Sequence, residues 1–67
     1  MFGQSKTKNI MRYLHYITRL SDNKQLESTY SNSSKPSWTN ELHCKESNGT
    51  LTYQIWDRET NEVTTVV

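Results

Sequence analysis

The sequence predicts an α+β fold in which one N-terminal amphipathic helix packs on a three- or four-stranded antiparallel β meander. Three observations lead to this prediction. Apolar residues recur at helical spacing in the first third of the chain, a polar stretch follows, and from residue 38 onward apolar and polar residues alternate as they do in strands. The whole chain, residues 1–67, is expected to form a single small domain.

The predicted helix spans about residues 5–21 and contains the stretch KNIMRYLHYITRL. Ser5 is a suitable N-cap, and Asn23 tolerates the left-handed conformation at which many helices end. One stripe of the helix is apolar at i, i+3, i+4, i+7 spacing and is expected to face the sheet. The residues of this stripe are Ile10, Tyr13, Leu14, Ile17 and Leu20.

A polar connection is predicted for residues 22–37, DNKQLESTYSNSSKPS. Alternation around residues 26–30 allows a short edge strand, and the remainder is expected to be a mobile loop.

Three strands are predicted for residues 38–67. The first covers residues 38–45, and the Asn48-Gly49 dipeptide after it favours a tight hairpin turn. The second is TLTYQIW, and the wider turn DRETN leads to the third, EVTTVV. The face expected beneath the helix carries Trp38, Leu42, Cys44, Leu51, Tyr53, Ile55 and Val63.

The composition indicates marginal stability, with 31% hydrophobic residues and a mean hydropathy of −0.94. One cysteine cannot form an internal disulfide, so a homodimer or another protein partner is expected to add stability. The lone cysteine also favours a reducing cytoplasm. No apolar run is long enough to cross a membrane, and no signal peptide is expected at the start.

No catalytic, cofactor or metal site is predicted, and the protein is not expected to be an enzyme. His43 and Cys44 are adjacent, but neighbours in a strand point to opposite faces and cannot act as a dyad. Asp57, Glu59 and Asn61 alternate as at the start of a calcium loop, yet Glu62 stands where that loop needs glycine.

The first candidate functional surface is the sheet face opposite the helix. Trp56 is expected to be exposed there, and tryptophan often anchors protein interfaces. The free edge of the last strand is a further place where a second copy could pair. The loop around Tyr30 either joins this surface or covers it. The residues expected to bind a protein partner are Trp56, Val66, His43 and Tyr30.

The second candidate surface is the outer side of the helix. The first 21 residues carry four bases and no acid, whereas residues 22–67 carry four bases and seven acids, a net charge of −3. Such a stripe could contact the phosphates of a nucleic acid, or it could simply be a solvated helix face, which base rates favour. The candidate anion-binding residues are Lys8, Arg12, His15, Tyr16 and Arg19.

The run ELHCKESNGTLTYQIWDRETNEV, about a third of the chain, resembles the hairpin of FlaG-type flagellar proteins, in which a strand ends in an Asp-x-Glu-Thr-x-Glu-Val turn. TTVV follows here, where that family has an Ile-Pro segment. The resemblance implies a flagellar or filament-associated component.

The function predicted first is a small, non-enzymatic binding or regulatory protein of the cytoplasm that occupies a surface of a larger macromolecule, as accessory and phage-type inhibitor proteins do. A nucleic-acid-binding protein that uses the basic stripe is the alternative, and the filament-associated component is the third.

Overall fold

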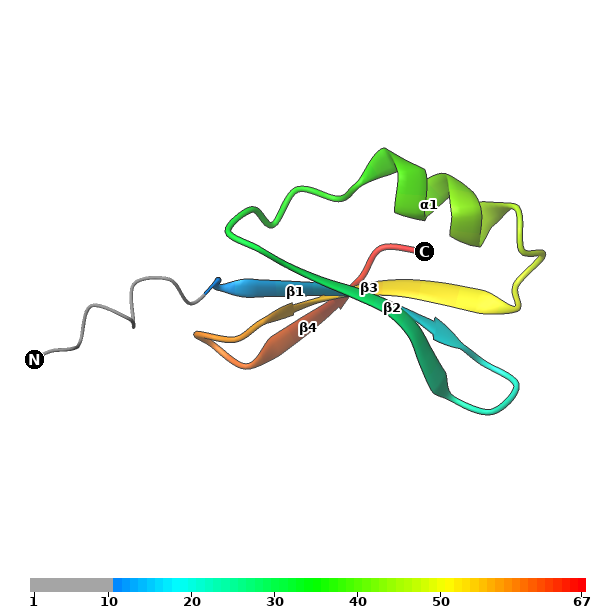
Figure 1. Cartoon of the computed structure of the whole chain (residues 1–67), viewed down its shortest axis with the longest axis horizontal. Coiled ribbons are helices and arrows are strands. Elements are labelled where there is room, and N and C mark those ends of the chain that lie inside the picture. The colour runs from blue at the N-terminus through cyan, green and yellow to red at the C-terminus, as the bar shows by residue number, and fades with distance from the viewer. Residues whose placement is uncertain (1–10) are drawn as a thin grey trace, which may run out of the picture.

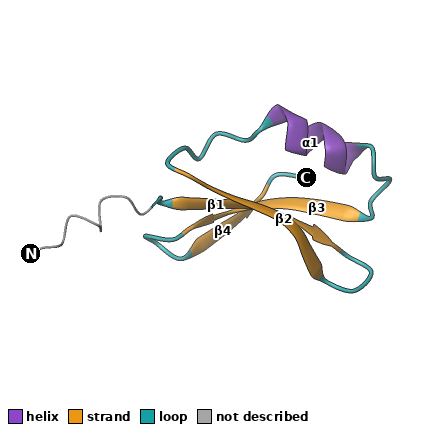
Figure 2. Cartoon of the chain, in the orientation of Figure 1, coloured by secondary structure: helices purple, strands orange, loops and turns teal. Residues whose placement is uncertain are grey.

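The structure, a computed structural model, describes residues 11–67 and arranges them as a four-stranded antiparallel sheet with one short helix on one side (Figures 1 and 2). The α+β class predicted from the sequence is therefore confirmed. The elements are β1 (Tyr13–Arg19), β2 (Lys24–Ser31), α1 (Trp38–Lys45), β3 (Leu51–Asp57) and β4 (Glu62–Thr65).

The strands lie in the order β2-β1-β3-β4, so β1 and β3 are central and β2 and β4 form the edges. Two hairpins, β1–β2 and β3–β4, are joined by antiparallel pairing of β1 with β3, in which His15 lies opposite Ile55. The chain passes from β2 to β3 over one side of the sheet, and α1 lies in this crossing (Figure 1). The predicted simple meander is therefore present only in the β3–β4 hairpin.

The predicted N-terminal helix is wrong over the residues that the structure describes, because Tyr13–Arg19 form strand β1; residues 5–10 of that prediction lie outside them. Leu14 and Ile17 point to opposite sides of the sheet, yet they are only 8% and 1% exposed. A central strand that buries both sides loses its alternation of apolar and polar residues. The apolar residues of such a strand can then fall at the i, i+3, i+4 spacing that is typical of a helix. Asn23 does adopt the left-handed conformation, with φ 59°, but in the β1–β2 turn.

The prediction of a strand at residues 38–45 is also wrong, because these residues form α1. Ser37 caps the helix, and its side chain accepts from the backbone N–H of Asn40. Glu41 and Lys45, one turn apart, form an ion pair at 3.5 Å. The Asn48-Gly49 turn, with φ 58° and 83°, therefore joins a helix to a strand and does not close a hairpin.

The other strand predictions are confirmed. The edge strand expected at residues 26–30 is β2, which is longer and contains an irregularity opposite Ile17 and Thr18. Strands β3 and β4 lie where the alternation placed them, and the turn between them uses Asn61 at φ 65°.

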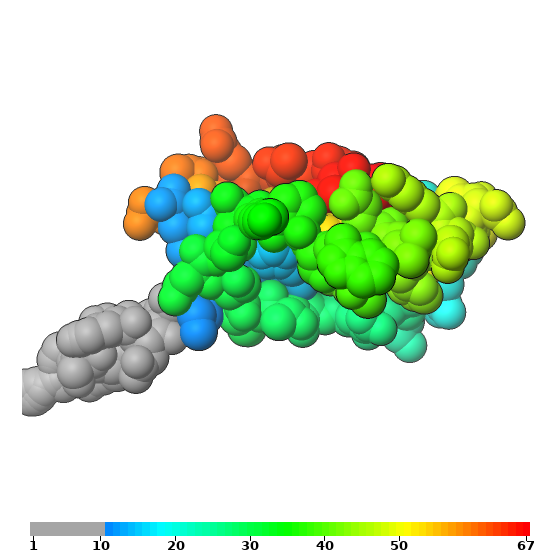
Figure 3. Space-filling model, turned by 90° about the horizontal axis from the view of Figure 1, so that it is seen from above, coloured from blue at the N-terminus to red at the C-terminus, as the bar shows by residue number. Residues whose placement is uncertain are grey.

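The segment between β2 and β3 covers one side of the sheet and leaves the other side uncovered by residues 11–67. We call residues 32–37 the strap; the strap and α1 lie over the covered face, and the opposite side is the open face (Figures 1 and 3). The core lies on the covered face and consists of Ile17, Cys44, Tyr53 and Ile55. Three residues expected in this core are instead exposed. These are Trp38 (72%), Leu42 (43%) and Val63 (51%).

Candidate functional site

The open face has no charged side chain on any of the four strands that form it. Register with Leu14 and Trp56 identifies its residues, because every second side chain of a strand points to the same side. They are Leu14, Tyr16 and Thr18 of β1; Gln25, Ser28 and Tyr30 of β2; Thr52, Gln54 and Trp56 of β3; and Val63 and Thr65 of β4.

Four large side chains form a line across this face, which we call the apolar row: Tyr30, Leu14, Trp56 and Val63. Each is the direct cross-strand neighbour of the next. Leu14 is only 8% exposed although no element of residues 11–67 covers it, because its neighbours shield it, whereas Tyr30 and Val63 are 55% and 51% exposed.

Two contacts orient the row. The indole Nε1 of Trp56 donates to the side-chain oxygen of Asn61 at 3.0 Å, which holds the ring against the β3–β4 turn. The guanidinium of Arg58 lies 4.8 Å from the ring centroid of Tyr30. A hollow of about 380 Å³ adjoins the row, and its lining includes Met11, Trp56 and Arg58. Contacts with Asn61 and Arg58 thus orient the aromatic side chains of the row, and a pocket lies beside Trp56.

Two of the residues predicted to bind a partner, Trp56 and Tyr30, belong to this row. Val66 does not: it follows β4 and packs against the core on the covered face. The turn pairs even-numbered residues of β3 with odd-numbered residues of β4, so Val63, not Val66, stands beside Trp56. His43 is exposed on α1, because the segment that carries it is a helix.

Within residues 11–67 the predicted basic stripe is not formed, and both of its arginines are paired with acids. Nε and Nη2 of Arg12 donate to the two carboxylate oxygens of Asp57 at 3.0 and 2.9 Å, and Nη1 lies 3.4 Å from Glu59. This bidentate hydrogen bonding lowers the pKa of Asp57 to about 2. Arg19 binds Asp22 in the same way, at 3.0 and 2.6 Å, and lowers the pKa of Asp22.

The other members of that stripe are scattered. Lys8 lies outside the described residues, Tyr16 is on the open face, and His15 is buried on the covered face at 6% exposure. A strand sends neighbouring residues to opposite sides, so side chains spaced for one helix face are separated.

His15 instead belongs to a buried hydrogen-bond network. Its Nε2 lies 2.7 Å from the carbonyl oxygen of Ser33, which can only accept, so Nε2 carries the hydrogen. The hydroxyl of Tyr53 accepts from the backbone N–H of Ser37 at 3.0 Å and donates to Nδ1 of His15 across 2.6 Å. The network ties the strap to both central strands. Nothing in the sequence pattern pointed to it, because its partners are 16 to 38 residues apart.

Cys44 is a core residue at 1% exposure, and burial raises the pKa of its thiol. Within residues 11–67, no three His, Cys, Asp or Glu side chains gather as metal ligands would. The helix that the structure describes in this range is too short and too polar to cross a membrane.

No family model matches the chain, and comparison with curated proteins and with solved structures also found no match. Of the segment that resembles the FlaG-type hairpin, residues 41–45 are helical, so only the part from β3 to β4 has hairpin geometry.

Proposed function

We propose that this protein is a small, non-enzymatic binding protein whose open face contacts a protein partner. The observation that carries this proposal is the apolar row, Tyr30–Leu14–Trp56–Val63, on a strand surface without charge and without cover from residues 11–67. An uncovered antiparallel face ordinarily carries polar and charged side chains. Interface cores, in contrast, are poor in charge and rich in tryptophan and tyrosine.

The shape of the row indicates the kind of partner. It crosses all four strands, a distance of about 14 Å at about 4.8 Å per strand spacing. The next row consists of Ser28, Tyr16, Gln54 and Thr65, and it is the more polar of the two because its only large apolar surface is the ring of Tyr16. A single apolar line beside a polar one matches the stripe of an amphipathic helix about nine residues long, at about 1.5 Å per residue. The hollow beside Trp56 can then receive one side chain of that helix.

The energetics favour such a contact. No strand contributes a charge to the row, so burying Leu14, Trp56 and Val63 does not require the desolvation of a charged strand residue. Arg58, whose guanidinium lies on the ring of Tyr30, needs to stay in contact with water or to meet an acid of the partner. Threonine, serine and glutamine around the row can exchange water for hydrogen bonds with the partner. The nucleic-acid alternative is less well supported, because Arg12 and Arg19 of the basic stripe are paired with carboxylates. The free, buried thiol of Cys44 is compatible with action in the cytoplasm.

The test compares the two tryptophans of the chain. Trp56→Ala removes the centre of the row, Val63→Arg places a charge at its end, and Trp38→Ala removes a 72% exposed tryptophan from α1 as the matched control. Each protein is immobilised in nuclease-treated lysate, retained proteins are identified by mass spectrometry, and binding is then measured with the purified partner. Wild type and Trp38→Ala should bind the same protein, and Trp56→Ala should weaken binding at least ~30-fold, as loss of an anchor costing about 2 kcal/mol does.

Circular dichroism should show that each variant is folded. Binding that survives Val63→Arg and Trp56→Ala contradicts the proposal. Self-association in sedimentation, abolished by Val63→Arg, would assign the open face to a second copy of the chain instead. Retention that disappears with nuclease would assign the function to nucleic acid.

A further inference from the structure

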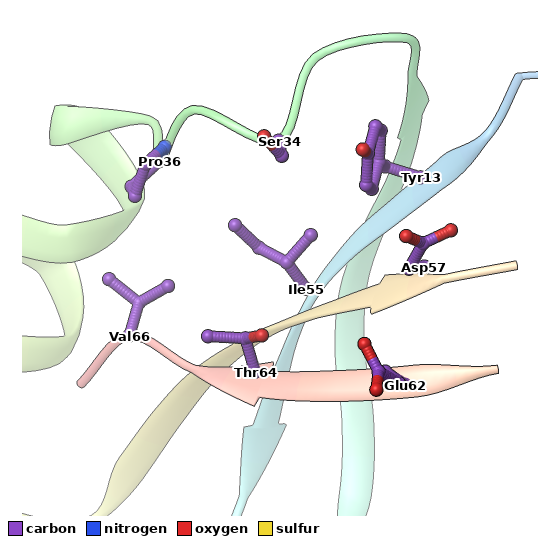
Figure 4. Close-up of a pocket in the computed structure, with 8 residues that line it drawn as sticks. All are labelled: Tyr13, Ser34, Pro36, Ile55, Asp57, Glu62, Thr64 and Val66. Atoms are coloured by element: carbon purple, nitrogen blue, oxygen red, sulfur yellow. The ribbon is translucent and has the colours of Figure 1, made fainter. Parts of the chain in front are cut away.

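A second hollow lies on the covered face, between the strap and the part of the sheet that α1 leaves uncovered (Figure 4). Its volume is about 420 Å³, within the range of small-ligand pockets. Ile55 lies at its centre at 5% exposure, and Pro36 of the strap and Val66 line one end (Figure 4). This end is apolar and can hold a hydrocarbon stem.

The opposite end is acidic. Asp57 and Glu62 are direct cross-strand neighbours, and both carboxylates line the pocket (Figure 4). Arg12 binds both oxygens of Asp57, but within residues 11–67 no basic group lies within 4 Å of Glu62. Like charges placed directly opposite each other destabilise a sheet. A cation at this end would relieve the repulsion.

An aromatic ring stands beside the two carboxylates. Tyr13 lines the same end, and the guanidinium of Arg12 already lies 5.1 Å from its ring centroid. The rim of the pocket therefore shows how this chain holds a cation, with a carboxylate on one side and an aromatic face on the other. Glu62 provides a second carboxylate that no base of residues 11–67 pairs with.

We propose that this pocket binds an ammonium group carried on a short apolar stem. The stem lies against Ile55, Pro36 and Val66, and the ammonium lies at Glu62. An alkylamine and a lysine side chain share this chemistry. The site is independent of the partner surface, because Thr64 faces the pocket while its neighbour Thr65 faces the open side.

The test is a titration of the full chain, labelled on Ile and Val methyl groups, with n-pentylamine and with 1-pentanol as the uncharged control. Pentylamine should shift the signals of Ile55 and Val66 in a saturable way, and pentanol should bind more weakly. Glu62→Gln should weaken amine binding about threefold to fivefold, the size of an exposed ion pair, and leave pentanol unchanged. Glu59→Gln is the matched control, since it makes the same change of charge in the turn that precedes Glu62, and Glu59 does not line the pocket.

Equal binding of amine and alcohol, equal effects of Glu62→Gln and Glu59→Gln, or no saturable shift of Ile55 would each overturn the proposal. A further titration with Nα-acetyl-lysine amide identifies the source of the cation. Binding as tight as that of pentylamine supports a lysine side chain of a protein, and weaker binding supports a free amine. None of these outcomes depends on the open face.

Discussion

The two faces of one sheet differ in a way that their hydrophobicity alone does not explain. The covered face holds the core, but it also holds a histidine network and all the strand charges whose side is given by the register, including Glu27, Asp57 and Glu62. The open face has no strand charge and displays the apolar row. Which face of the sheet is covered therefore depends on the path that the chain takes between β2 and β3. The covered face therefore supplies the stability of the sheet, and the open face is free for contact.

The largest expected effect comes from breaking the covered face at its centre. Ile17→Ala removes a side chain that is 1% exposed, and it should lower the free energy of unfolding by about 2–5 kcal/mol. Val63→Ala, on a 51% exposed residue of the open face, should change it by less than about 0.5 kcal/mol. Urea denaturation followed by circular dichroism measures both. Similar losses for the two variants would show that the open face is as structural as the covered one.

A smaller loss is expected when the strap is released. Tyr53→Phe deletes the hydroxyl that accepts from Ser37 and donates to His15, so two polar groups lose their partner. The expected cost is about 1–3 kcal/mol. Tyr16→Phe on the open face is the matched control and should have little effect. The same denaturation experiment applies, with the exchange rate of the His15 Nε2 hydrogen as a second measurement. A slow exchange rate retained in Tyr53→Phe would mean that the strap does not depend on this hydroxyl.

Low pH should weaken the ion pair between Arg12 and Asp57 at the end of the central strands β1 and β3. The pKa of Asp57 is lowered from 3.8 to about 2 in the folded state, chiefly by its hydrogen bonds to Arg12. Its stabilising contribution is therefore complete above about pH 4 and is lost as the pH falls through about 2. Arg12→Gln should reduce stability at neutral pH and flatten its pH dependence between these values. Urea midpoints from pH 2 to pH 6 measure this.

Arg19→Gln is the control for this experiment. It breaks the ion pair between Arg19 and Asp22, which are three residues apart, so this pair does not link distant strands. It should change the urea midpoint less than Arg12→Gln does. A pH profile that is the same in wild type and Arg12→Gln would remove Asp57 as the cause.

The smallest change in stability is expected for two neighbouring residues of β4. Thr64 lines the covered-face pocket, whereas Thr65 points to the open face. Thr64→Lys and Thr65→Lys, both at exposed positions, should each change stability by less than about 0.5 kcal/mol. Thr64→Lys should abolish amine binding and preserve partner binding, and Thr65→Lys should do the reverse. Loss of both activities in one variant would show that the two faces are not independent.

Local signals were sufficient for several elements. The alternation of TLTYQIW and EVTTVV, with a polar turn between them, determined the β3–β4 hairpin, and Asn61 takes the positive φ that such a turn needs. The edge strand around Leu26 was also visible. Signals for the helix at 38–45 were present but were outweighed by an accidental alternation. They are the Ser37 cap and the Glu41–Lys45 spacing.

Some residues of the candidate site could be predicted from the sequence, and others could not. Trp56 and Tyr30 could be selected from residue type, because aromatic residues on a sheet favour interfaces. The predicted exposure holds for Tyr30, at 55%, whereas Trp56 is half-buried. Their neighbours in the row could not be selected, since Leu14 was assigned to a helix. Whether Val63 or Val66 accompanies Trp56 depends on the register set by one turn.

Local patterns in the sequence were enough to predict the α+β class, the hairpin of β3 and β4, and the edge strand. They also contain the separation of charge that appears in the structure as arginine–carboxylate pairs. Residues 13–19 form a strand because of long-range pairing, with β2 on one side and with β3, some 38 residues away, on the other. Buried on both sides, it carries apolar residues at spacings that a helix would also satisfy. The path of the strap then determines which face is covered. The strap is short and has few apolar residues, so it is held in place by hydrogen bonds to His15 and Tyr53. These bonds can form only after the sheet has brought the two residues together.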